Sequence, residues 1–306
     1  MNTAFLKFKL KMILTFAIVL LITFFVIYGI VIYLGYGINN IYLFYVSIFI
    51  TLVYVLFQWA IGPNLIHTFN KENEITKDSK YSWILDIVDN VAKKNKIKRP
   101  KVYIANVNYL NAYAYGNIFT GPRVAITKGL LNILDKDEIE AVLGHEIGHL
   151  RHRDVSLLMA IGIIPTLIYW LGLLLSYNPE LNRRGNSMLI GFGLIAFSFI
   201  FEFFILYINR QREALEDINS VFTVKKPKSL EMALAKITLA NQGVYVNHNS
   251  INNMLMFSPL NNKEEIDDPN KLIEKWRKEK VSIFEELFMD HPHPANRIKL
   301  IESVSR

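Results

Sequence analysis

Two histidines and a glutamate stand in the pattern His145-Glu146-Ile147-Gly148-His149. On an α-helix, residues four positions apart project from the same face, so the two imidazoles could bind one metal ion together. Neutral imidazole nitrogens bind Zn²⁺ at about 2.0–2.1 Å. Glu146 lies at the edge of that face, where its carboxylate could act as the general base for a water molecule. The motif therefore predicts a zinc site that performs hydrolysis, with one Zn²⁺ per chain.

A zinc site of this kind needs a third protein ligand. The chain contains no cysteine, which excludes thiolate ligands, disulfide bonds and cysteine nucleophiles. The extended zinc motif with a third histidine six residues after His149 is also excluded, because Val155 occupies that position. The remaining candidates are glutamates of a later segment, namely Glu202, Glu213 and Glu216.

Two apolar runs follow the motif, at residues 157–176 and 187–208, and a short loop joins them. We expect them to form antiparallel helices whose axes are about 8–10 Å apart. If the first helix continues from the motif, His149 lies about 12 Å beyond its apolar part, and Glu213 lies about 7.5 Å beyond the second run, at 1.5 Å per residue. Both side chains would then reach a similar height on facing helices.

The other two glutamates fit this arrangement less well. Glu202 lies inside the second apolar run, and Glu216 points to a different face of the helix from Glu213. Glu213 is therefore the favoured third ligand, with Glu216 as the alternative to test. Asp217 shares a face with Glu213, and it could orient a ligand histidine by accepting a hydrogen bond.

Hydrophobic residues make up 52% of the 306-residue chain and are concentrated in a few blocks. No Asp, Glu, Lys or Arg occurs between Lys11 and Lys71. A transmembrane helix needs about 20 consecutive apolar residues, and residues 12–34 and 41–61 meet that requirement. Together with the two later runs they predict four transmembrane helices, which excludes a purely soluble protein and an intrinsically disordered one.

The distribution of lysines predicts the orientation in the membrane. Cytoplasmic segments next to membrane helices carry an excess of lysine and arginine, and Lys7, Lys9 and Lys11 precede the first run. We therefore expect a multi-pass protein of the plasma (inner) membrane with its catalytic domain in the cytoplasm. The expected parts are an N-terminal helix pair at 1–66, a first catalytic part at 67–156, a second helix pair at 157–208 and a second catalytic part with the tail at 209–306.

The polar segments indicate a mixture of helices and strands. Asp135 followed by Glu138 predicts a capping box, and so a helix that begins near Lys136 and carries the motif. The expected fold is an α-helical membrane protein with four transmembrane helices and an α+β zincin-like metalloprotease domain. Periodicity predicts the other elements, which are helices at 81–96 and 229–242, strands at 101–104 and 123–126, a turn-rich stretch at 111–121 and a mobile loop at 243–280.

Four motifs follow one another along the chain, namely Asn111–Gly116, Ala141–Leu150, Arg212-Glu213 with Asp217, and His291-Pro292 with Arg297-Ile298. Together they resemble the HtpX-type integral-membrane zinc metalloproteases, whose relatives include the CAAX prenyl endoproteases. The resemblance implies that His145, His149 and Glu213 bind zinc and that Glu146 is the catalytic base.

The resemblance also assigns residues to the substrate. It implies that Asn111, Ala112 and the strand at 122–128, with Val124 and Ile126, hold the substrate backbone.

The same family pattern concerns the tail and one helix position. It implies that His291 and Arg297 lie near the scissile bond, where they could stabilise the oxyanion. One departure from the family pattern is Glu216, which stands where the family usually has a small residue. A charge at that position puts tight helix packing there in doubt.

We expect a membrane-bound zinc metalloendopeptidase that hydrolyses peptide bonds of membrane or misfolded proteins near the cytoplasmic membrane surface. Its partners would be protein substrates and the lipid bilayer, with no nucleic acid. A role in protein quality control is implied by the resemblance alone. The alternatives are a non-catalytic metal-binding membrane scaffold or regulator, a prenyl-protein processing enzyme, and a transporter, for which Glu202 within an apolar run is the main indication.

Overall fold

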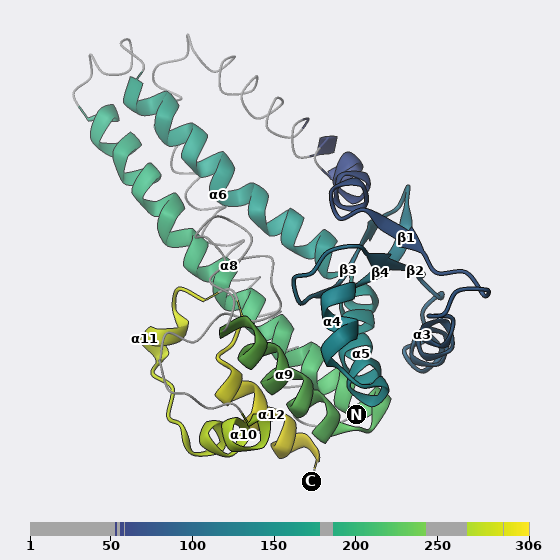
Figure 1. The fold of residues 1–306 in the computed structure, drawn as a ribbon. Helices are drawn as coiled ribbons and strands as arrows, with labels where there is room; N and C mark the ends of the chain where they lie inside the picture. Colours follow the sequence, from purple (N-terminus) through teal and green to yellow (C-terminus); the bar gives the residue numbers. More distant parts are fainter. Residues whose placement is uncertain are drawn as a thin grey trace.

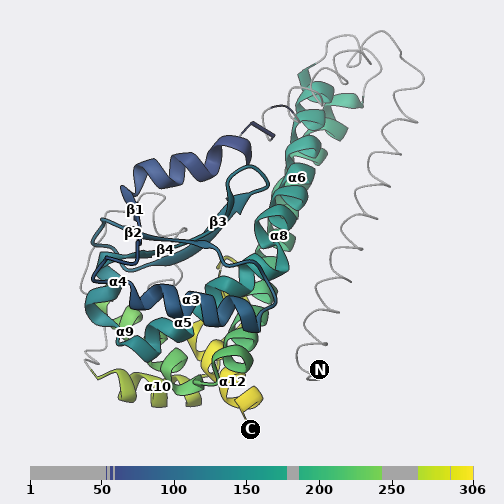
Figure 2. The ribbon, with the colours of Figure 1, turned by 90° about the vertical axis from the view of Figure 1, so that its right-hand side faces the viewer.

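A computed structural model describes residues 59–177, 186–242, 268–289 and 291–305, together with positions 53, 56 and 57. Two long helices lie side by side and extend away from a body that contains a sheet and several shorter helices (Figures 1 and 2). The expected membrane runs 12–34 and 41–61 lie outside the described residues, apart from a few positions at the end of the second run.

The sheet has four strands in the order β1-β2-β4-β3. Strands β2 and β4 pair in parallel, and the other two pairs are antiparallel. Strand β4 therefore lies inside the sheet, while β3 has a free edge. The strand bounds are β1 (Glu72–Glu74), β2 (Lys101–Ala105), β3 (Ala112–Asn117) and β4 (Gly121–Thr127).

The two expected strands correspond to β2 and β4, but the stretch expected to be rich in turns contains β3. That prediction was wrong because the sequence Ala-Tyr-Ala-Tyr-Gly alternates large and small residues with the period of two that a strand requires. The alternation gives β3 two different faces. The expected helix at 81–96 is confirmed as α3 (Trp83–Lys94).

Helix α5 (Lys136–His152) carries the histidine motif and begins at the expected capping box. The backbone amide of Glu138 donates to Asp135 Oδ1 at 2.9 Å, and the amide of Asp135 donates to Glu138 Oε2 at 2.9 Å. The helix ends at Arg153, whose φ of 58° is left-handed. The expected continuity of the motif helix with the following apolar run is therefore wrong, because that conformation ends one helix and starts another.

The two long helices are α6 (Asp154–Tyr177) and α8 (Ser187–Val224), which contain the two later apolar runs. They pack against each other along their length (Figure 1). Among the described residues, α8 is the one helix that is both long and apolar enough to cross a membrane, and Ile164–Ser176 is a shorter apolar stretch. Helix α8 then continues as a single rod into the body.

The remaining helices surround the main core. Helix α10 lies within the stretch expected to be a mobile loop, so that prediction was wrong for these residues. Leu272, Ile273 and Trp276 form a narrow buried stripe on an otherwise charged helix, and Asp268 caps its first turn. The helices are α4 (Lys128–Ile133), α9 (Pro227–Gln242), α10 (Pro269–Lys278), α11 (Ile283–Glu286) and α12 (Pro294–Ser305).

Helices α5 and α8 approach each other closely because α5 presents glycines to α8. A Cβ added at Gly144 would lie 2.5 Å from Val224 Cγ2 and 2.9 Å from Ser220 Oγ. Two hydrogen bonds cross the same contact, from Ser220 Oγ to the carbonyl of Ala141 at 2.6 Å and from Asn219 Nδ2 to the carbonyl of Gly144 at 3.2 Å. A side chain at Gly144 would have to displace the side chains of Val224 and Ser220, so glycine at this position favours the close contact.

We predict that Gly144→Ala lowers the thermal unfolding midpoint of the protein. Alanine is better than glycine inside a helix by about 1 kcal/mol, so helix propensity alone would stabilise the variant. Overpacking a tight contact costs about 1–3 kcal/mol, and we expect that cost to prevail. The matched control is Gly193→Ala in α8, where no atom lies within 4 Å of the added Cβ. A Gly144→Ala variant as stable as the wild type would contradict the close packing of α5 and α8.

Candidate metal centre

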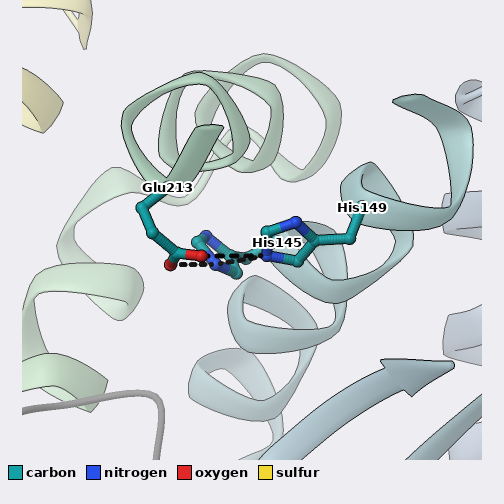
Figure 3. A group of neighbouring side chains, drawn as sticks. All are labelled: His145, His149 and Glu213. Carbon is teal, nitrogen blue, oxygen red and sulfur yellow. Dashed lines mark hydrogen bonds and ion pairs between the residues drawn. The ribbon is translucent and has the colours of Figure 1, made fainter. Parts of the chain in front are cut away.

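His145 and His149 of α5 converge with Glu213 of α8, and their ligand atoms all lie within 4.8 Å of one another (Figure 3). The Nε2 atoms of the two histidines are 3.2 Å apart. Glu213 Oε2 lies 3.3 Å from His145 Nε2, and Glu213 Oε1 lies 3.5 Å from His149 Nε2. Three potential ligand side chains from two helices therefore surround a single point.

These separations fit a zinc ion. Two ligands that each lie about 2.0–2.1 Å from a tetrahedral ion are about 3.3 Å apart, and the three measured separations bracket that value. Two imidazole nitrogens and one carboxylate are also a usual donor set for zinc. Among the described residues, Glu213 Oε2 is a buried oxygen without a hydrogen bond, which a cation would satisfy.

Histidines of α5 face carboxylates of α8 at this site, and each group shifts the pKa of the other. Burial lowers the pKa of His145, but the nearby carboxylates of Asp217 and Glu213 outweigh it and raise that pKa to about 10. Burial alone would raise the pKa of Glu213, but the nearby His291, His145 and His149 hold it well below its usual value. The carboxylate therefore stays ionised and faces positive charge.

Asp217 supports His145 from the side away from Glu213. Its Oδ1 lies 3.0 Å from His145 Nδ1, and it also accepts a hydrogen bond from Arg297 at 2.6 Å. Arg297 Nε donates to Asp217 Oδ2 at 2.7 Å, and neither side chain is more than 1% exposed. A bound zinc ion would displace the proton from Nε2, and the hydrogen bond to Asp217 would keep the remaining proton on Nδ1, so that the Nε2 lone pair points at the metal.

Asp217 lies within hydrogen-bond distance of His145, as its predicted supporting role requires. Arg297 contacts Asp217. The ion pair with Arg297 lowers the pKa of Asp217 although burial raises it, so the carboxylate remains charged. The expectation that Arg297 also approaches the scissile bond stays a prediction. His291 lies nearby, with Nδ1 at 3.2 Å from Glu213 Oε2.

Glu146 lies on α5 between the two histidines in sequence and is 4% exposed. Burial raises the pKa of its carboxyl group, and the two histidines and a hydrogen bond to the backbone of Ala114 oppose that rise. A general base works best when its pKa is near the operating pH, so a raised pKa suits this role. The contact with Ala114 also places Glu146 against the edge strand β3.

The strand expected to hold the substrate backbone was assigned incorrectly. Val124 and Ile126 lie in β4, which pairs with β2 on one side and β3 on the other, and their exposed fractions are 0% and 1%. A strand with both edges paired has no backbone groups left for a substrate. The free edge belongs to β3, which begins at Ala112 directly after Asn111.

Glu216 does not join the three ligand residues. It is fully buried, and its Oε1 lies 2.5 Å from His152 Nδ1. A Cβ at Gly148 would lie 1.8 Å from Glu216 Oε2, so the missing side chain at that glycine makes room for the carboxylate. The helices can pack closely around the Glu216 carboxylate because Gly148 leaves room for it and His152, one turn further along α5, pairs with it. Glu202, the other candidate, lies earlier in α8 than Glu213 and is exposed.

Comparisons with known proteins identify a family and relatives for this chain. Residues 78–305 match the model of peptidase family M48. The chain is 43% identical over 270 residues to a protein named protease HtpX homolog 2 from Sulfurisphaera tokodaii, and the match covers 83% of each chain. It is 42% identical over 278 residues to protease HtpX homolog from Thermoplasma acidophilum, with 87% of each chain covered.

A solved structure shares the fold. The crystal structure of Ste24p from S. mikatae superposes with a TM-score of 0.60 at 19% sequence identity. The match covers 96% of this chain and 67% of Ste24p. At this identity the likeness shows a shared fold.

We predict that Asp217→Asn weakens zinc binding by about 10–100-fold, the usual effect of losing a hydrogen-bond partner of a ligand histidine. The amide can no longer fix the proton of His145 on Nδ1, so Nε2 is less available to the metal. Competition with a chromophoric chelator measures the affinity, and a thermal melt of the same sample checks that the fold is intact. A folded variant with unchanged affinity would show that Asp217 does not orient His145.

Proposed function

This chain belongs to peptidase family M48, and we propose that it acts as a membrane-bound zinc metalloendopeptidase. Its coarser activity, a membrane-associated protease with protein substrates, follows from its HtpX relatives. The observation that carries the finer proposal is the convergence of His145, His149 and Glu213, whose ligand atoms have the mutual distances of a zinc site. We propose that these three residues hold one Zn²⁺.

The chain's own residues would carry the proton through the reaction. Zinc, when bound, supplies Lewis acidity to the scissile carbonyl and to a water molecule. Glu146 takes a proton from the attacking water as the oxygen bonds to the carbonyl carbon, and it delivers that proton to the amine as the C–N bond breaks. We propose that His291, close to Glu213, and Arg297, paired with Asp217, stabilise the oxyanion as it develops.

The substrate would bind as an additional strand along the free edge of β3. In an antiparallel pair, successive residues direct their backbone groups alternately toward the partner strand and away from it. The amide of Thr127 donates to the carbonyl of Asn111 at 3.0 Å, so Asn111 faces β4. The backbone groups of Ala112 and Ala114 then face the free edge, next to Glu146. Strand addition of this kind recognises the backbone of an extended peptide with little sequence selectivity.

We infer that the reaction takes place close to the bilayer. Glu213 lies on the same continuous helix as the apolar run 187–208. Glu213 is the fifth residue after the end of the run, a rise of about 7.5 Å. Substrates would therefore be membrane proteins or misfolded segments presented at the cytoplasmic face of the inner membrane, and clearance of such proteins would be a form of quality control. The division into two membrane helix pairs and two catalytic parts is proposed with it.

We predict that Glu146→Gln abolishes peptide cleavage while zinc binding is retained. General-base catalysis contributes about 10²–10⁴-fold to the rate, so we expect a loss of at least about a hundredfold in kcat. The measurement is cleavage of an unfolded membrane-protein substrate by the full chain in detergent or nanodiscs, with zinc content determined on the same sample.

Glu140→Gln is a suitable control, since Glu140 lies on the same helix but contacts Lys226 at 2.5 Å. Cleavage that persists in Glu146→Gln would contradict the assigned role of this residue. A wild-type protein that binds zinc and cleaves no substrate would instead favour the alternative of a metal-binding scaffold or regulator.

A further inference from the structure

Another buried carboxylate, that of Glu72, lies outside the metal centre, on β1 at the opposite edge of the sheet from β3. The side chain of Glu72 is 0% exposed. Its Oε1 accepts a hydrogen bond from the hydroxyl of Tyr113 at 2.7 Å, and its Oε2 accepts one from the hydroxyl of Tyr115. His67 Nδ1 lies 3.1 Å from Oε2 as well. One carboxylate therefore has contacts with three side chains.

These contacts join three separate elements across one face of the sheet. Tyr113 and Tyr115 extend from β3 over the interior strands, where the small side chain of Ala125 lies opposite Tyr113 in the register. His67 belongs to the short helix at residues 59–69, which lies on this face of the sheet (Figure 2). Glu72 thus connects both edges of the sheet and the helix above it.

Both carboxylate oxygens of Glu72 have hydrogen-bond partners. A buried carboxylate is costly unless donors surround it, and here two phenols and an imidazole do so. Burial, and next the hydrogen bond to Glu72, raise the pKa of both tyrosines, so the phenols keep their protons. The guanidinium of Arg123 lies 5.8 Å from the ring centre of Tyr115 and adds positive charge to the cluster. The groups therefore have fixed positions.

The other face of β3 meets the catalytic helix. Side chains alternate between the faces of a strand, so Ala112 and Ala114 point away from Glu72. Ala112 packs into the main core, and the backbone of Ala114 hydrogen-bonds Glu146. A further bond, from Asn117 Nδ2 to the carbonyl of Trp59 at 2.7 Å, ties the end of β3 to the same short helix. Strand β3, which lies next to Glu146, is therefore held on its other face by contacts with Glu72 and with the short helix.

We propose that Glu72 is a positioning residue for substrate binding: through Tyr113 and Tyr115 it holds the free edge of β3 at a fixed place beside Glu146. The proposal rests on the proposed function, because it concerns the edge to which the substrate would add. Glu72 does not contact the reacting atoms. Its loss should therefore weaken the binding of an extended peptide and leave the chemical step nearly unchanged.

The test compares the wild type with Glu72→Gln in the full chain. The amide keeps the shape of the side chain but accepts fewer hydrogen bonds and carries no charge. We expect the KM for a long unfolded peptide to rise about tenfold, the factor for loss of one hydrogen bond to a charged group. The value of kcat should stay within about threefold, and the zinc content should not change. Tyr113→Phe, which keeps the ring and removes one donor, should raise KM by less.

Hydrogen exchange of the β3 amides gives a readout that does not depend on cleavage. The amides of Tyr113 and Tyr115 should exchange about tenfold faster in Glu72→Gln, because the strand opens more often without its anchor. The matched control is Glu231→Gln on α9, another buried glutamate, which contacts Arg277 at 3.5 Å. Neither KM nor exchange in β3 should change there.

Two results would overturn the proposal. Unchanged exchange in β3 of Glu72→Gln would show that the carboxylate does not hold the strand. A fall in kcat at constant KM would show that it acts on the chemistry rather than on substrate binding. If the wild type cleaves no peptide, the proposed function fails, and the exchange measurement still decides whether Glu72 anchors β3.

Discussion

The close approach of α5 and α8 is the constraint on which the metal centre depends. Glu213 of α8 meets the two imidazoles of α5 because the two helices pack closely at this level. Gly144 and Gly148 permit that approach, and Ser220 and Asn219 reinforce it with hydrogen bonds to backbone carbonyls of α5. Packing between helices and chemistry at the site are therefore consequences of the same small residues.

Features of a single helix can be predicted from the sequence, because they depend on residues only three or four positions apart. The capping box at Asp135 depends on residues three apart, and the pairing of His145 with His149 depends on residues four apart, so both follow from helix periodicity. The choice of Glu213 also followed from helix geometry, although the assumed continuity across Arg153 was wrong. The structure places Glu213 beside the two histidines because the two long helices lie side by side, and its role as a ligand stays a prediction.

The features that sequence analysis missed depend on contacts between distant residues. Nothing local shows that β3 is an edge strand and β4 an interior one, because strand order is a property of the whole sheet. The contacts of Glu72 with Tyr115 and of Glu216 with His152 join residues 43 and 64 positions apart. The alternation of tyrosine with alanine could have predicted β3 as a strand. Nothing in the sequence predicts that Glu72 would bind its tyrosines.

Zinc binding by purified full-length variants tests the central claim most directly. The account predicts one zinc per chain in the wild type and in Glu216→Gln, because Glu216 contacts His152 instead of the ligand cluster. It predicts that Glu213→Gln, on the same helix, binds zinc at least about a hundredfold more weakly, since a ligand is lost rather than its support. Equal zinc affinity in Glu213→Gln and the wild type would contradict the account.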